Sequence, residues 1–174
     1  IRNGYFVEFG VKDGIDLSNT YLLEKMFNWN GILSEPATVF HKDLFINREV
    51  NISKNCVWNR SNEKLIFNEV MDASELSTID SFANKDMHFK NRRNYKQYKV
   101  NTITLEDLLK KYNAPKIIDY LSIDTEGSEY EIIKDFNFKN YQFRVITIEH
   151  NYTKQRKDIE KLLSDNGYKR KFEE

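Results

Sequence analysis

The sequence predicts a mixed α/β fold in which a mostly parallel, doubly wound sheet carries helices on both faces. Two observations lead to this prediction. Short apolar runs alternate with segments of helical spacing along most of the chain, and such alternation is typical of parallel sheets. Several of the apolar runs also end at a glycine or an acidic residue, and the carboxyl ends of parallel strands are where ligands bind in folds of this kind.

The bulk composition limits the classes of protein to consider. The chain has 174 residues, enough for one α/β domain with its own core. We expect a single domain over 1–174 with a hairpin or lid insertion at about 59–99. Basic and acidic residues number 27 each, so no overall field attracts nucleic acid or anionic lipid.

Cysteine usage and hydropathy point to the cytoplasm. Cys56 is the only cysteine, which excludes an intramolecular disulfide and gives no sign of an oxidising compartment. No apolar stretch approaches the roughly 20 residues of a membrane-spanning helix. We therefore expect a cytoplasmic protein with no membrane or nucleic-acid partner. The chain begins at Ile1 and enters a predicted strand almost at once, so it is also expected to be a candidate fragment of a longer protein.

The first part of the chain contains two predicted strand–helix units. Each strand is a short run of apolar residues that stops at a glycine or a proline, as buried strands do. Ser18 is the expected N-cap of the first helix, and the second helix is expected to turn Val39, Phe40 and Leu44 inward. In order, the predicted elements are a strand at 5–9, a helix at 19–27, a strand at 32–36 and a helix at 37–48.

The remaining elements continue the alternation after one interruption. Segments 50–58 and 64–70 are predicted strands separated by a polar turn, which indicates a third sheet strand and an added hairpin arm. Segment 71–98 has no interpretable pattern. Thr104 opens a capping-box sequence. The elements predicted beyond it are a helix from 104 to about 113, a strand at 117–123, a helix at 127–136, a strand at 143–148, a helix at about 153–165 and the start of a strand at 168–172.

Acidic residues gather at the predicted strand ends. Gly10 and Gly14 are only the outer glycines of a phosphate-binding turn, and Glu8 just before them would repel a pyrophosphate. A sulfonium donor such as S-adenosylmethionine is cationic, so carboxylates suit it. Glu35, at the end of the second strand, is placed to accept both ribose hydroxyls. The alternative for Glu8 is a strand residue that pairs with a lysine or caps the next turn. The alternative for Glu35 is a residue at an exposed strand end.

Four blocks of sequence together resemble the FkbM-type methyltransferases. The resemblance runs in order from about 4 to 151, through the segments 6–14, 18–24, 31–36 and 121–129. It implies the Rossmann-like fold of class I methyltransferases, S-adenosylmethionine as cofactor and a hydroxyl oxygen of a sugar or other small metabolite as acceptor. Because the family continues into a last strand, the resemblance also implies a sheet truncated at that strand.

The resemblance assigns roles to individual positions. It implies that Glu8, Gly10 and Gly14 form the loop around the methionine end of the cofactor, with Asp13 between the two glycines. Asn19 is expected near the cofactor carboxylate. Glu35 is expected at the ribose, and Asp124 and Glu126 beside the transferred methyl group.

An alcohol is a poor nucleophile and needs a base or a metal ion to activate it. Asp124, Glu126, Glu149 and His150 are the candidates. His150 has the most suitable ordinary pKa, and its alternative interpretation is an imidazole bonded to backbone. Asp124 is equally an N-cap candidate for the following helix. Asp124, Glu149 and His150 would also suit Mg²⁺ or Mn²⁺, and the sequence leaves this metal hypothesis open.

Other classes of function stay open at this point. They are a nicotinamide-dependent oxidoreductase, a catalytically inactive methyltransferase-like binding domain, and a metal-dependent nuclease, which zero net charge disfavours. The expected partner is a small-molecule or glycan acceptor of unknown identity. Phe89, Tyr95 and Tyr98 could stack on a sugar. The alternative is that they belong to an ordinary helical arm with no role in binding. The basic residues nearby are interpreted as a solvated face, with phosphate binding as the alternative. These are Lys90, Arg92, Arg93, Lys96 and Lys99.

Overall fold

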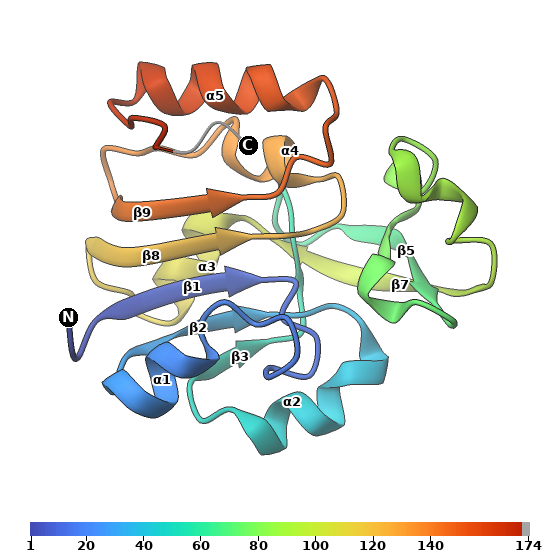
Figure 1. Ribbon diagram of the computed structural model, residues 1–174, viewed down its shortest axis with the longest axis horizontal. Helices are drawn as coiled ribbons and strands as arrows, with labels where there is room; N and C mark the ends of the chain where they lie inside the picture. The colour runs from blue at the N-terminus through green and yellow to red at the C-terminus, as the bar shows by residue number, and fades with distance from the viewer. Residues whose placement is uncertain (172–174) are drawn as a thin grey trace.

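A computed structural model describes residues 1–171 and contains two sheets (Figure 1). The larger sheet has the strand order β3-β2-β1-β8-β9, and every neighbouring pair is parallel. The chain builds outward from β1 through β2 and β3, then crosses back to β8 and β9, so the strand order reverses between β1 and β8. The five strands are β1 (Tyr5–Phe9), β2 (Asn30–Ser34), β3 (Asn51–Ser53), β8 (Ile117–Ile123) and β9 (Gln142–Ile148).

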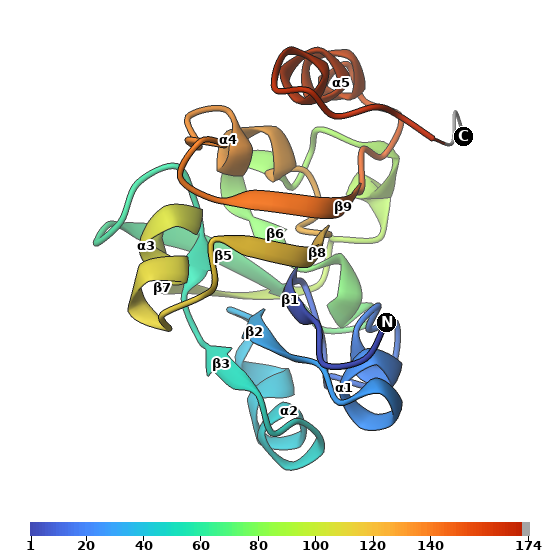
Figure 2. The same ribbon diagram turned by 90° about the vertical axis from the view of Figure 1, so that its left-hand side faces the viewer.

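Helices cover both faces of this sheet (Figure 2). Successive strand residues point to opposite faces, so Phe6 packs with Leu44 of α2 on one face. Val7 packs with α3, α4 and α5 on the other face. The doubly wound prediction is confirmed. In the described part of the chain, no helix combines the length and the apolar character needed to cross a bilayer. The helices are α1 (Tyr21–Phe27), α2 (His41–Asn47), α3 (Leu105–Lys111), α4 (Glu129–Ile133) and α5 (Gln155–Asp165).

The second sheet projects beyond the carboxyl ends of the parallel strands (Figure 1). Its strand order is β4-β7-β5-β6; β5 pairs antiparallel with β7 and β6, whereas β4 runs parallel to β7. We call residues 64–103 the arm. Phe67, Phe82 and Val100 of the arm form a core of their own with Ala37 and Cys56. The strands are β4 (Cys56–Val57), β5 (Lys64–Val70), β6 (Thr78–Ile79) and β7 (Tyr95–Ile103).

Short 3₁₀ turns complete the connections. One precedes α2, and three lie within the arm, where the sequence had no interpretable pattern. They are η1 (Thr38–Phe40), η2 (Ser74–Leu76), η3 (Asp80–Phe82) and η4 (Met87–Lys90).

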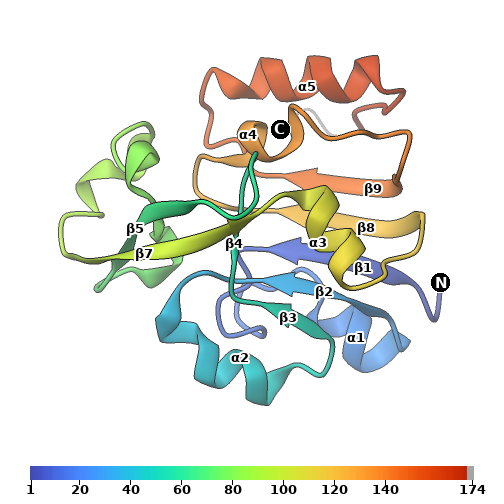
Figure 3. The ribbon, with the colours of Figure 1, turned by 180° about the vertical axis from the view of Figure 1, so that it is seen from behind.

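The predicted strand at 50–58 is wrong as a single element. It is two short strands, β3 and β4, which belong to different sheets (Figure 3). The segment before the turn at 59–63 does not form a hairpin with β5. Besides β6, β5 pairs antiparallel with β7, whose first residue is 25 positions beyond the last residue of β5 (95 minus 70). An apolar run gives no information about which strand it will pair with, so the sequence could not separate these possibilities.

The helix-start predictions were confirmed at one site and wrong at another. Thr104 caps α3, because its side chain accepts a hydrogen bond from the Asp107 N–H. Ser18 caps no helix: α1 begins at Tyr21, and the Ser18 hydroxyl donates to Glu8 instead. A carboxylate buried beneath the loop competes for the hydroxyl that a cap would use.

Other predicted boundaries also change. The helix at 37–48 is a 3₁₀ turn followed by α2, and Val39 is 52% exposed rather than inward. The helix at 127–136 shortens to the five residues of α4. Residues 168–171 form no strand, and the last residue of that prediction, Phe172, lies outside the described residues.

The reversal point of the sheet depends on one glycine. Gly10 has a φ of +73°, and a Cβ placed there would lie 1.7 Å from the carbonyl oxygen of Asp124. The Asp124 N–H in turn donates to the Phe9 carbonyl oxygen at 3.3 Å. The end of β1 and the end of β8 can therefore approach only because position 10 has no side chain.

We expect Gly10→Ala to prevent folding or to cost about 3 kcal/mol or more, since left-handed strain and overpacking add. Gly167→Ala is the matched control: φ is +87°, but no atom lies within 4 Å of the added Cβ, so only the strain of roughly 1–2 kcal/mol remains. Urea unfolding of both variants measures the difference. Equal losses would contradict the proposed close approach.

Candidate active site

A cavity of about 280 Å³ lies between the carboxyl edge of the parallel sheet and the arm. It sits where the strand order reverses, which is where ligands bind in doubly wound sheets. The arm contributes one wall, including Phe67 and Ile79. The structure brings together at this cavity five of the residues predicted from sequence: Gly10, Glu35, Asp124, Glu126 and Glu149.

Glu35 follows β2 directly and lines the cavity while only 5% exposed. Its two carboxylate oxygens accept the N–H groups of Lys12 at 3.0 Å and Ala37 at 2.8 Å. Burial raises the pKa of Glu35 to about 7, against the lowering effect of these hydrogen bonds. The alternative of a surface strand end is wrong. Val11 contributes a further backbone hydrogen bond, so the carboxylate keeps capacity for at least one more donor.

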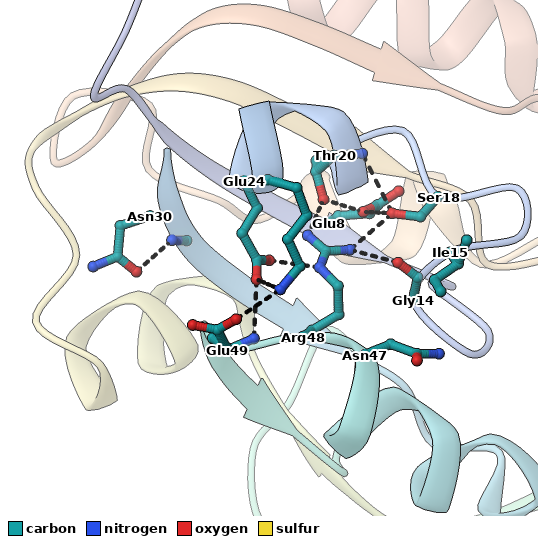
Figure 4. Close-up of polar contacts among 12 residues, drawn as sticks. Glu8, Gly14, Ile15, Ser18, Thr20, Glu24, Asn30, Asn47, Arg48 and Glu49 are labelled. Carbon is teal, nitrogen blue, oxygen red and sulfur yellow. Dashed lines mark hydrogen bonds and ion pairs between the residues drawn. The ribbon is translucent and has the colours of Figure 1, made fainter. Parts of the chain in front are cut away.

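Glu8 does not line the cavity, although the sequence predicted that it would contact the cofactor. It is 1% exposed and lies beneath the loop that follows β1 (Figure 4). One carboxylate oxygen accepts the Asn19 N–H, and the other accepts the hydroxyls of Ser18 and Thr20. Burial raises the pKa of Glu8, while these three donors oppose the shift. Its carboxylate organises the loop at 10–20 from below.

Arg48 supports this loop from the end of α2, and the sequence analysis did not identify it. Its side chain is fully buried and pairs with Glu24 at 2.5 Å (Figure 4). It also donates to the Gly14 carbonyl oxygen at 3.0 Å and to the hydroxyls of Ser18 and Thr20. An arginine after the last turn of a helix normally indicates a solvated end, so no sequence pattern marked it.

Three further residues expected at the cofactor lie around the same loop and not at the cavity. A Cβ at Gly14 would lie 2.6 Å from Cγ of Arg48, so this glycine makes room for the arginine. Asp13 accepts two backbone N–H groups of its own turn. The Asn19 side chain donates to Ser122 of β8 at 3.0 Å. These residues shape the loop, and Lys12 of the same loop lines the cavity.

Asp124, Glu126 and Glu149 form a carboxylate cluster. One oxygen of each lies within 4.8 Å of the others. Burial raises the pKa of all three groups, and their mutual repulsion raises the pKa of Glu126 further, to about 7. Glu149 shares a hydrogen bond with Asp124, and repulsion between the two groups raises the pKa of Glu149. The pair is therefore described as two carboxylates that share one proton. Such a pair can hold or accept a proton near neutral pH.

Arg92 connects the arm to this cluster. Its guanidinium bonds Asp86 at 2.6 and 2.8 Å and Glu126 at 2.7 Å, with the side chain only 1% exposed. The interpretation of Arg92 as part of a solvated basic face is wrong. Asn151 adds a second contact by donating to Glu149 at 3.1 Å and to Glu126 at 3.4 Å.

His150 lies outside the cluster and does not line the cavity. Its Nδ1 accepts the Tyr152 N–H at 3.1 Å, which matches the backbone-bonded alternative. Burial and nearby arginines lower its pKa. The predicted ligand set of Asp124, Glu149 and His150 is wrong in its third member, because Glu126 occupies that place.

Asp124 is also not the N-cap of α4. The residue at that cap is Ser128, and the loop before it is held by Glu129. The Glu129 carboxylate accepts the N–H groups of Thr125 and Gly127. The Asp124 carboxylate is therefore left to the cluster.

The sequence matches a known protein family. A family model described as the methyltransferase FkbM domain matches residues 8–170. The chain belongs to the FkbM methyltransferase family. No curated protein and no solved structure gives a significant match. The match covers the loop after β1, the arm and every member of the carboxylate cluster, so the cavity of this FkbM domain lies wholly within the family region.

The cluster makes stability depend on pH. The pKa of Glu149 is raised from 4.5 by folding, so the unfolded chain loses this proton first, and the fold loses stability as pH rises above about 4.5. We expect Glu149→Gln to raise Tm at pH 8 by about 2–4 °C, which is ~1 kcal/mol in a chain of this size, and to leave Tm at pH 5 unchanged. Thermal unfolding at both pH values measures this.

Glu75→Gln is the control for this variant, because Glu75 lines the same cavity but is exposed. Its Tm should follow that of the unmodified chain at both pH values. A Glu149→Gln variant less stable than the unmodified chain at pH 8 would contradict the repulsion inferred for the cluster.

Proposed function

We propose that the FkbM domain transfers a methyl group from S-adenosylmethionine to a hydroxyl oxygen of a small molecule or glycan. One observation carries the proposal: Glu35 and the carboxylate cluster face a single cavity at the reversal point of the sheet. S-adenosylmethionine, when bound, supplies the methyl group on a cationic sulfonium. The cavity is lined by five acidic residues and one lysine, Lys12, which favours a cation over a pyrophosphate.

Glu35 supports the placement of the ribose. Its carboxylate is fixed by the backbone N–H groups of Lys12, Ala37 and Val11 and keeps accepting capacity, so it can accept a ribose hydroxyl without moving. A preordered acceptor binds with less loss of side-chain entropy. Cys56, Val57 and Phe67 provide apolar wall beside it, as an adenine requires.

Asp124 is the proposed base. Asp124 shares a proton with Glu149 and is the exposed member of the cluster, so it is placed to accept the proton of an acceptor hydroxyl as its oxygen attacks. Glu149 and Glu126 position it, and Arg92 offsets the charge of Glu126. General-base assistance of this kind is worth about 10²–10⁴ in rate. We propose that the cavity holds the sulfonium methyl group and the attacking oxygen in line.

A nicotinamide oxidoreductase has less support, because acids line the position where a pyrophosphate would bind. A methyltransferase-like domain without activity would keep the fold and lack cofactor affinity. Titration with S-adenosylhomocysteine and with NAD⁺ separates these classes in one experiment.

We expect S-adenosylhomocysteine to bind, and Glu35→Gln to weaken it roughly tenfold to hundredfold, since a hydrogen bond to a charged group contributes about 1.5–3 kcal/mol. Glu69→Gln is the control: Glu69 is also 5% exposed, but it bonds Thr38 and Tyr98 and does not line the cavity. Its charge repels Glu35 and raises the pKa of that group, so its removal should not weaken binding. Calorimetry measures both affinities. Binding of NAD⁺ in place of S-adenosylhomocysteine would contradict the proposal.

We expect methyl transfer to persist in EDTA. The cluster has the geometry of a divalent-ion site, but Arg92 and the proton shared by Asp124 and Glu149 already reduce its negative charge. Turnover of labelled S-adenosylmethionine is followed with and without the chelator. Activity lost in EDTA and restored by Mg²⁺ would assign these three acids to a metal instead.

A further inference from the structure

A second, wider groove of about 610 Å³ lies beside the carboxylate cluster. One wall is the arm at residues 85–87, with Phe82 behind it. The opposite wall is the segment 151–155 between β9 and α5, and Gly127 lies between the two walls. The groove thus joins three parts of the chain that are distant in sequence.

The groove is connected to the proposed base through shared residues. Asn151 lines the groove and donates to both Glu126 and Glu149. Asp86 lines the groove and is joined to Glu126 through Arg92. The groove and the cluster are therefore linked directly through Asn151, and through Arg92 by way of Asp86.

The charge of the groove is opposite to that of the cavity. Its cationic residues are Lys85 on the arm and Lys154 on the facing segment, both exposed. Its one acid, Asp86, is paired with Arg92, which also bonds Glu126. The cavity suits a cation, whereas the groove suits an anion, and two ligands with these charges would also attract each other across the cluster.

The groove also offers flat and apolar surface. Tyr152 is 71% exposed, and Met87 is 61% exposed on the opposite wall. Asn151 and Tyr152 have φ values of +43° and +52°, which is costly backbone for residues with side chains and recurs where a segment is shaped for a ligand. Tyrosine rings and amide side chains are suited to the faces and hydroxyls of a sugar ring.

We propose that this groove binds the methyl acceptor, and that the acceptor is a hydroxylated compound with a phosphate group that Lys85 and Lys154 hold between them. This inference rests on the proposed methyl transfer, since it adds the acceptor to that site. The phosphate fixes one end of the acceptor in the groove, and the hydroxyl-bearing end extends past Asn151 toward the cavity that Asp124 lines.

The test uses glucose 1-phosphate as the probe, with glucose and inorganic phosphate beside it. Affinities are measured by calorimetry at constant ionic strength on the FkbM domain without cofactor, and then with S-adenosylhomocysteine present. We expect glucose 1-phosphate to bind at least about tenfold more tightly than glucose. We expect Lys85→Gln and Lys154→Gln each to weaken it at least about fivefold.

Lys90→Gln is the matched control. The Lys90 ammonium lies over the Phe89 ring as that of Lys85 lies over Phe82, but Lys90 is outside the groove. Its affinity for glucose 1-phosphate should be unchanged. Equal binding of glucose and glucose 1-phosphate overturns the inference, as does an equal loss in all three variants, which would indicate attraction by surface charge in general.

A failure of this inference differs from a failure of the proposed function. The groove variants lie away from Glu35, so they should keep the S-adenosylhomocysteine affinity of the unmodified chain. Retained S-adenosylhomocysteine binding with no selectivity for phosphate overturns the groove alone. Loss of S-adenosylhomocysteine binding in the unmodified chain contradicts the proposed function itself.

Discussion

The close approach of β1 and β8 at Gly10 and Asp124 is the constraint on which the rest of the site depends. It places two strand ends so near that no side chain fits at position 10. The loop after β1 must then turn toward β2, where the Lys12 N–H meets Glu35. On the other side, Asp124 is directed to Glu149 at the end of β9. One backbone contact therefore fixes the positions of both the proposed ribose acceptor and the proposed base.

The acids at this edge differ in role because their surroundings differ. Glu8 is surrounded by donors of the loop and serves as its internal support. Glu35 is held by backbone alone and keeps accepting capacity toward the cavity. The cluster acids have few donors and raise one another's pKa. The number of donors that each carboxylate meets thus separates the structural role of Glu8 from the recognition proposed for Glu35 and the proton transfer proposed for the cluster.

The arm contributes walls to both the cavity and the groove at the edge of the sheet. It is anchored through Tyr98 and Glu69, which bond the segment after Glu35 at Thr38. It is anchored again through Arg92 at Glu126. Because both anchors end beside proposed functional residues, the arm positions acidic and basic walls on either side of one cluster. In this arrangement, a cationic donor and an anionic acceptor would meet at the cluster.

The sequence by itself determined the alternation of strands and helices that builds the parallel sheet, the cap at Thr104 and the gathering of acids at strand ends, since these follow from local periodicity and chain direction. Only the tertiary structure decided that Glu8 turns into its loop, that His150 bonds backbone, and that Glu126 and Arg92 join the cluster. It alone revealed Arg48 and the partner of β5. Most of these outcomes depend on contacts between residues ten or more positions apart, from Glu8 and Ser18 to Arg92 and Glu126, and local pattern carries no information about which distant donor a buried carboxylate will find.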